Sequence, residues 1–324
     1  MFQAPRSHSH LSIDESLSRV QQLRSILSRQ SSIDTENLLQ KYNYTRIKQD
    51  LVSGDIIRKC FLLQALRWKI TKPPTFEKRD AVVRTFADND LLGLEEQQSE
   101  YCDRILHMLR SANGNLQQTF TRFLNAFASF SKGRTYLSKS SRLLSILTDS
   151  LANGHYLSTS SHDMMLGTLQ KLSLRRPLQE FMISEGILEW VVKRLEDIDV
   201  LTDYSLEYAI ALFMNLCLQS SGKEHCLRMV QPTLVVLKKL LVLGNAEILP
   251  YVNGALYSLL SKREIRQAAL EMKIEADLKE LIDVSQPEIK KQVEFVLSKL
   301  LSSEDSKDSV HNSNEASDSE DEDD

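Results

Sequence analysis

The sequence predicts an all-α protein built as an armadillo-type right-handed α-solenoid. Glycine (10) and proline (7) are scarce in the 324 residues, as expected of a chain that is almost wholly helical. Most of the prolines stand between segments with helical apolar spacing. Two columns of apolar residues also recur at intervals of 44 to 46 residues: Leu137, Phe181, Cys226 and Leu270, and Leu147, Val191, Leu237 and Leu281. A period of roughly 40–47 residues is typical of HEAT and armadillo arrays.

Four comparable stretches carry this period, and they distinguish the two kinds of array. They cover residues 125–151, 171–197, 215–241 and 258–284. Each contains the end of a helix, a polar turn, a short helix, a second break and an apolar-periodic helix. HEAT repeats lack the extra short helix, so the pattern favours armadillo repeats. We expect four repeats between about residues 113 and 300, with at least one irregular unit before them.

The segments before these repeats show weaker signals. Residues 12–30 have apolar residues at helical spacing but cover too few heptads to predict a coiled coil. Residues 55–71 predict a strongly apolar helix, which Pro73 stops. Thr75 is the expected N-cap of the next helix, over residues 75–93.

Glycine and proline mark the breaks within the repeats. Gly186 is expected to end one helix in the left-handed conformation, so that the next begins at a new angle. Pro232 is expected in the first turn of a helix. Gly244 can end a helix and Pro250 can open the next. The last predicted helix, residues 287–301, begins with proline and carries the outward lysines of a terminal cap.

Charge divides the chain into three parts. Residues 302–324 hold ten acidic residues and one lysine, a charge of −9, and predict a disordered acidic tail. Residues 1–43 are expected to be disordered or to form a short helix, and residues 44–301 to form the solenoid. Ser317 and Ser319 each precede a glutamate by three residues and are candidate phosphorylation sites for an acid-directed kinase.

Several classes of protein lack support in the sequence. No apolar run reaches the roughly 18–20 residues that span a bilayer, and the start has no secretory character, which predicts a soluble intracellular protein. The four cysteines form no CxxC pair and are expected to be buried reduced thiols. Cys217, His225 and Cys226 lack a fourth zinc ligand, so no metal and no cofactor is predicted.

Catalytic motifs are also missing. The stretch SSGKEH (220–225) lacks the earlier glycine and the following Ser or Thr of a phosphate-binding loop. His162 and Asp163 are explained by capping at a predicted helix start. Without a convergent set of acid, base and nucleophile, the chain is not expected to be an enzyme. Its basic residues are spread out without interleaved aromatics, which makes nucleic acid a weak candidate.

Aligning the third helices of the repeats gives a column of candidate groove residues: Asn125, Lys171, Asn215 and Ser258. Third helices line the concave face of an armadillo array, so these residues are predicted to form a polar ladder there. An asparagine amide both donates and accepts hydrogen bonds and could hold the backbone of an extended peptide. The alternative, exposed polar residues without a ligand, stays open.

Nuclear-import receptors of this fold place tryptophan four residues before that asparagine. The corresponding residues here are all small: Thr121, Gly167, Ala211 and Gly254. A groove that clasps lysine between indole rings is therefore not expected. Arg175 and Arg176 are interpreted first as the last turn of a helix and its link to the next, and second as a contact for an acidic partner or for the acidic tail.

Five stretches closely resemble the LisH domain-containing armadillo-repeat protein 9 family: 44–71, 124–137, 166–190, 201–223 and 250–261. The resemblance implies a non-enzymatic protein of the ciliary basal body and axoneme, needed for cilium assembly or stability and for ciliary signalling. It also implies microtubule-associated ciliary or centrosomal protein partners, and a location in the cytoplasm and cytoskeleton.

Members of this family begin with a LisH dimerisation motif and a coiled coil. Residues 1–43 do not resemble LisH, so the chain is expected to be a short isoform, a fragmentary gene model or a divergent homologue of the family. The alternative function is a general cytosolic or nuclear armadillo adaptor that binds extended peptides and is regulated by its acidic tail.

Overall fold

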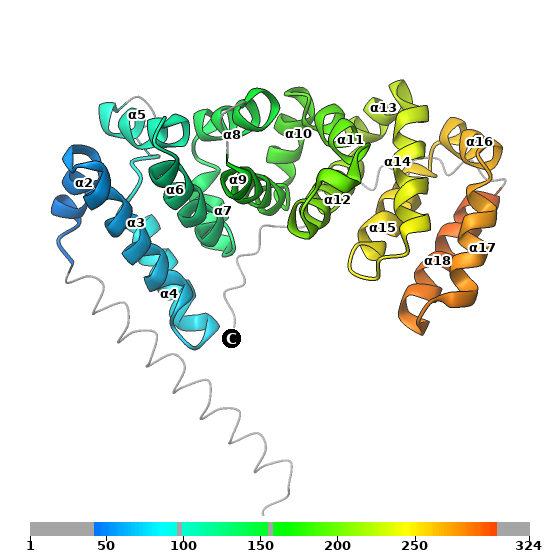
Figure 1. The fold of residues 1–324 in the computed structure, drawn as a ribbon, viewed down its shortest axis with the longest axis horizontal. Coiled ribbons are helices and arrows are strands. Elements are labelled where there is room, and N and C mark those ends of the chain that lie inside the picture. The colour runs from blue at the N-terminus through cyan, green and yellow to red at the C-terminus, as the bar shows by residue number, and fades with distance from the viewer. Residues whose placement is uncertain (1–41, 96–98, 155–157, 303–324) are drawn as a thin grey trace, which may run out of the picture.

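The computed structural model describes residues 42–95, 99–154 and 158–302. Within these ranges every regular element is a helix. The helices stack side by side in one curved array (Figure 1). The predicted helix at 12–30, nearly all of the predicted N-terminal segment and acidic tail, and Ser317 and Ser319 lie outside the described residues.

The array opens with a pair of helices, α2 (Tyr44–Ser53) and α3 (Ile56–Thr71). Five three-helix units follow in the described ranges: α4 (Phe76–Asp88), α5 (Glu100–His107) and α6 (Gly114–Phe127); α7 (Ser131–Leu137), α8 (Ser141–Asn153) and α9 (Thr159–Leu172); α10 (Arg176–Ser184), α11 (Ile187–Leu195) and α12 (Asp203–Cys217); α13 (Ser220–Arg228), α14 (Val230–Leu243) and α15 (Leu249–Leu259); and α16 (Arg263–Glu271), α17 (Ile274–Val284) and α18 (Pro287–Leu301). Short 3-10 turns lie at Met108–Arg110 and Ile198–Val200.

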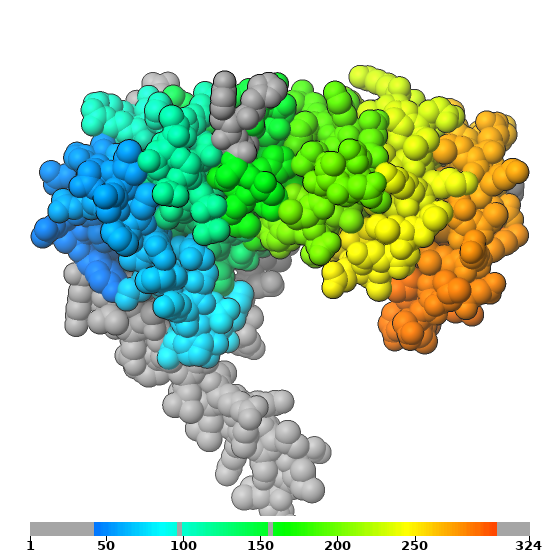
Figure 2. All heavy atoms as spheres, in the orientation of Figure 1, coloured from blue at the N-terminus to red at the C-terminus, as the bar shows by residue number. Residues whose placement is uncertain are grey.

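Each class of helix packs against its counterparts in the neighbouring units. The third helices form one continuous row, which we call the third-helix row: α3, α6, α9, α12, α15 and α18. The second helices α8, α11, α14 and α17 form a row of their own. The two ends of the array, α3–α4 and α17–α18, extend toward the same side (Figure 1), and a hollow lies between them in Figure 2. These features confirm the predicted all-α armadillo-type solenoid.

The predicted helix starts and breaks are present. The Thr75 hydroxyl accepts a hydrogen bond from the Lys78 N–H at 3.4 Å and caps α4. Gly186 and Gly244 have φ angles of 76° and 64°, the left-handed conformation that lets a helix end without a steric penalty. Pro250 is the second residue of α15.

The helix predicted over 75–93 ends early, at Asp88. Asp90 takes a left-handed φ of 44°, and its Oδ1 accepts hydrogen bonds from the Tyr136 hydroxyl (2.7 Å) and the Leu94 N–H (2.8 Å). Tyr136 belongs to the next unit, on α7. A tertiary contact from Tyr136 therefore adds to the local bonds that hold the chain in its turn after Asp88.

The core confirms one predicted apolar column and corrects the other. All four residues of the column that begins at Leu147 are buried. In the other column Phe181 is half-buried and Leu270 is 38% exposed. The buried column consists of Leu137, Met182, Cys226 and Ala269, each 0% exposed. A slip of one residue turns a helical side chain by about 100°, enough to move it from the core to the surface.

A repeated hydrogen bond joins successive units. A side chain of the first helix donates to a carbonyl oxygen at the end of the preceding third helix or in its link. The donors, with their acceptors, are Arg79 (Pro73 O, 2.6 Å), Arg134 (Ala128 O, 3.2 Å), Gln179 (Ser173 O, 2.7 Å) and Arg266 (Leu260 O, 2.8 Å). The last carbonyls of a helix have no partner within it, so these bonds satisfy them and fix the angle between units.

Candidate functional site

The predicted ladder residues lie on four successive helices of the third-helix row. Asn125 is on α6, Lys171 on α9, Asn215 on α12 and Ser258 on α15. They do not form a uniform exposed ladder. Asn125 and Lys171 are half-buried, whereas Asn215 and Ser258 are 5% and 8% exposed.

Asn125 and Lys171 bind each other. The Lys171 ammonium donates to Asn125 Oδ1 at 2.6 Å and to the Asn125 carbonyl oxygen at 3.1 Å. The amide nitrogen of Asn125 donates to the Tyr204 hydroxyl at 3.0 Å and lies 3.2 Å from Met164 Sδ. One amide thus links α6, α9 and α12, so its donor and its acceptor are both used within the protein.

Tyr204 and Tyr208 complete this network. Their rings stack with centroids 4.1 Å apart, and the Lys171 ammonium lies 5.8 Å from the Tyr208 ring centroid. Burial raises the pKa of Tyr204 well above its usual value. Sequence reasoning missed both tyrosines. Tyr208, Ala211 and Asn215 lie four, seven and eleven residues after Tyr204. This spacing places all four on one face of the helix and could have revealed the two tyrosines.

The expectation of an exposed ladder is wrong for Asn215 and Ser258. The Asn215 amide donates to Ser173 Oγ at 2.9 Å, and the Ser258 hydroxyl donates to the Cys217 carbonyl oxygen at 2.7 Å. Ser173 and Cys217 lie at the ends of the preceding third helices. Both side chains therefore stabilise the junction of two helices, where close packing removes them from solvent.

Arg175 lies in the link between α9 and α10, as predicted, and Arg176 begins α10, so neither arginine lies in the last turn of α9. α9 ends at Leu172, Arg175 is the N-cap of α10, and Arg176 is its first residue. The partial positive charge of a helix start disfavours cations, so the helix dipole does not stabilise this pair. Arg175 donates to Thr135 Oγ1 at 2.6 Å. Arg176 is exposed and has no hydrogen bond or ion pair to the described residues.

Arg134 brings a third cation to this region. Burial, and to a smaller extent the charge of Arg134, lower the pKa of Lys171 to about 8. Burial and the charge of Arg175 lower the pKa of Arg134. We call Arg134, Lys171 and Arg175 the cationic cluster. Within the described residues, no carboxylate oxygen lies within 4 Å of any of its charged nitrogens.

Close packing explains why this chain has small residues at the positions that correspond to the tryptophans of import receptors. A Cβ on Gly167 would lie 2.3 Å from the Tyr204 hydroxyl oxygen, and one on Gly254 would lie 2.7 Å from Met214 Sδ. Thr121 is buried. Side chains of adjacent helices thus occupy the space that an indole ring would need.

Asp163 does not cap its helix as predicted. α9 begins at Thr159 with Ser158 as its N-cap, which places Asp163 beyond the first turn. Its carboxylate accepts hydrogen bonds from the Thr202 hydroxyl at 3.3 Å and from the Ser205 hydroxyl. Asp163 is buried. Its two hydrogen bonds join α9 to the start of α12.

The four cysteines of the described chain are free thiols. Cys102, Cys217 and Cys226 are buried free thiols as predicted, whereas Cys60 is only half-buried. Cys217 Sγ lies 3.8 Å from Cys226 Sγ. No group of three His, Cys, Asp or Glu side chains among the described residues could hold a metal ion.

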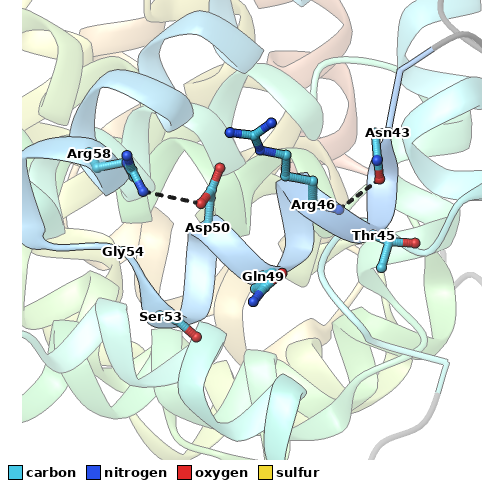
Figure 3. A pocket seen from close by; sticks show the side chains of 8 residues that line it. All are labelled: Asn43, Thr45, Arg46, Gln49, Asp50, Ser53, Gly54 and Arg58. Atoms are coloured by element: carbon cyan, nitrogen blue, oxygen red, sulfur yellow. Dashed lines mark hydrogen bonds and ion pairs between the residues drawn. The ribbon is translucent and has the colours of Figure 1, made fainter.

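Figure 3 shows a polar hollow along α2 at the first end of the array, lined by Asn43, Thr45, Arg46, Gln49, Asp50, Ser53, Gly54 and Arg58. Asp50 Oδ1 lies 3.5 Å from Arg58 Nη1, so acid and cation offset each other. Asn43 Oδ1 accepts from the Arg46 N–H at 2.9 Å and caps the helix. No helix in the described part of the chain is long and apolar enough to cross a membrane.

A curved array of three-helix units with a continuous third-helix row defines an armadillo-repeat protein. The structure is similar to a designed armadillo repeat protein solved in complex with peptide (KR)4, with a TM-score of 0.64 and 15% identity over 80% of this chain and 100% of that one. That likeness shows the fold.

The sequence comparisons identify the family. Residues 182–301 match the model for the ARM repeats of LisH domain-containing protein ARMC9. The chain is 44% identical over 263 residues to LisH domain-containing protein ARMC9 of Danio rerio, covering 81% of this chain and 32% of that protein. It is 42% identical over 267 residues to the Homo sapiens protein, covering 82% and 32%. The chain belongs to the ARMC9 family, and it spans about a third of the length of these relatives.

Proposed function

We propose that this chain is a non-enzymatic armadillo scaffold of the ciliary basal body and axoneme, where it supports cilium assembly or stability and ciliary signalling. Its partners are microtubule-associated ciliary or centrosomal proteins. The observation that supports this role is the match to ARMC9 proteins over 263 and 267 residues, 81% and 82% of this chain. The polar groups of the third-helix row also join helices to each other, which suits a binding scaffold better than a catalyst.

Localisation and deletion in ciliated cells test this proposal. The tagged chain should concentrate at basal bodies and along cilia, and its loss should shorten or destabilise the cilia. A matched chain that lacks residues 303–324 tests whether the solenoid alone is sufficient for localisation. Absence from basal bodies together with normal cilia after deletion would contradict the role.

The second candidate is a general cytosolic or nuclear adaptor that binds extended peptides along the third-helix row. The cationic cluster favours it, because three half-buried cations without a carboxylate partner attract an anionic ligand. The designed armadillo repeat protein of similar fold is described in complex with the basic peptide (KR)4. Because the cluster in this chain is cationic, the peptide that it binds should instead be acidic. Fluorescence anisotropy with (ED)4 and (KR)4 tests this: the acidic peptide should bind, and a preference for the basic one would refute it.

A further inference from the structure

The cationic cluster is held in place by neutral groups. Arg134 Nη1 donates to the carbonyl oxygens of Ala128 (3.2 Å) and Ser129 (3.3 Å). Arg175 Nη1 donates to the Thr135 hydroxyl, and the Lys171 ammonium donates to Asn125. A guanidinium has five N–H donors and an ammonium has three, so each cation keeps donors for a further partner.

The cluster lacks a counterion inside the described chain. Other cations of the array pair with carboxylates across neighbouring units, as Arg110 does with Asp149 at 2.7 Å. Within the cluster, burial and then the charge of a neighbouring cation lower the pKa of both Arg134 and Lys171. Repulsion between half-buried like charges is relieved when an anion binds among them.

A segment of this chain has the complementary charge. Residues 303–324 carry ten acidic residues and one lysine, and six of the last seven, 318–324, are acidic. We propose that the cationic cluster, in which Lys171 at the end of α9 lies with Arg134 on α7 and Arg175 at the start of α10, is an anion-binding site, and that the acidic segment 303–324 of the same chain is its ligand. This inference rests on the proposed peptide-binding role of the row, because a partner would compete with the segment for the same cations.

The chain is long enough for this contact. The segment follows α18, and the path along the third-helix row from α18 through α15 and α12 to α9 has three steps. Packed helices lie about 8–10 Å apart, so the path is roughly 30 Å. The 22 residues 303–324 can extend over roughly 70 Å. The acidic run 318–324 therefore reaches α9 with slack.

Binding of the segment in trans tests the site directly. The probe is a fluorescein-labelled peptide of residues 303–324, titrated by anisotropy into the full chain and into a chain that ends at residue 302. The shortened chain should bind the peptide, and the affinity should fall steeply with salt. The full chain should bind at least about tenfold more weakly, because its own segment competes at a high effective concentration.

Two sets of variants assign the effect to the cluster. In the shortened chain, Lys171→Gln with Arg175→Gln should weaken binding by about tenfold or more, since charge-assisted hydrogen bonds are lost. The matched control, Lys193→Gln with Lys239→Gln, removes two exposed charges from the second-helix row and should change affinity less than twofold. Replacing the acids of 318–324 by their amides in the full chain leaves the solenoid intact and should restore peptide binding to the level of the shortened chain.

Three outcomes would overturn the inference. The shortened chain could fail to bind the peptide, or it could bind equally with and without Lys171 and Arg175. If the full and shortened chains bound the peptide equally, the chain's own segment would not occupy the cluster. The ligand would then be an acidic segment of another protein. None of these results bears on the ciliary localisation. If the protein bound peptide (ED)4 but not the segment, the adaptor role would be supported and the segment would be excluded as the ligand.

Discussion

Lys171 Nζ lies 2.6 Å from Asn125 Oδ1, so two residues that the sequence aligned as separate rungs of a ladder bind each other. The bond crosses from α9 to α6, and Tyr204 extends it to α12. The polar residues of the third-helix row therefore hold successive repeats together. In a solenoid each repeat contacts only its neighbours, so bonds of this kind add to the coupling that the shared apolar core provides.

Gly167→Ala should destabilise the protein although glycine is a poor helix residue. Alanine in mid-helix is normally more stable by about 0.5–1 kcal/mol. Here the new Cβ would meet the Tyr204 hydroxyl oxygen at 2.3 Å, which forces the tyrosine away from Asn125. We expect a net loss of about 1–2 kcal/mol in the free energy of unfolding, from overpacking and the lost hydrogen bond. Urea denaturation followed by circular dichroism measures it.

Two comparisons isolate the clash at Gly167. In a Tyr204→Ala background, Gly167→Ala should become neutral or stabilising, because the obstructing group is gone. Gly114→Ala, whose Cβ would have no atom within 4 Å, should not destabilise. Equal losses with and without Tyr204 would show that this contact does not determine the cost.

Asp163→Ala should cost about 1–3 kcal/mol in the free energy of unfolding, because it leaves the hydroxyls of Thr202 and Ser205 without their buried acceptor. Asp163→Asn keeps one acceptor oxygen and should lose less. The exposed neighbour Asp203 provides the control, and Asp203→Asn is expected within about 0.5 kcal/mol of the parent. Urea midpoints give the order, and equal midpoints for Asp163→Ala and the parent would contradict it.

The sequence predicted the array well and its polar contacts poorly, for physical reasons. The repeat period and the positions of glycine and proline depend on local backbone geometry. They therefore predicted the helix breaks at Gly186, Gly244 and Pro250. The links from Arg134 to Lys171 and Arg175, and from Tyr204 to Asn125, join residues 37 or more positions apart. A local pattern can place Tyr204 on a helix face, but it does not identify the residues of other helices that it contacts. Asn215 was predicted to be exposed because polarity alone cannot distinguish a solvated residue from a buried, hydrogen-bonded one.

Cys60 should be the one thiol that reacts rapidly in the folded protein. It is half-buried, whereas Cys102, Cys217 and Cys226 are fully buried. Burial also raises the pKa of Cys102 and Cys217, which lowers the fraction present as reactive thiolate. With Ellman's reagent we expect one fast equivalent in the native state and four in denaturant. Cys60→Ser should remove the fast equivalent, and a second fast thiol would disagree with the packing around Cys217 and Cys226.

The stability of the protein should rise with pH between about 8 and 10 through Lys171. Its pKa is about 8 in the folded chain, against 10.5 for a free lysine, chiefly because burial disfavours the charged form. In this window the unfolded chain binds more protons than the native one, so raising the pH favours the native state. The parent should gain about 1–3 kcal/mol relative to Lys171→Met by pH 10. Urea midpoints of both proteins at pH 7, 8, 9 and 10 measure this difference.

Arg134→Gln removes the second cause of the lowered pKa of Lys171, so the rise in stability should shift to higher pH, whatever the effect of the substitution on overall stability. Parallel curves for the parent and Lys171→Met would show that the lysine does not titrate in this range.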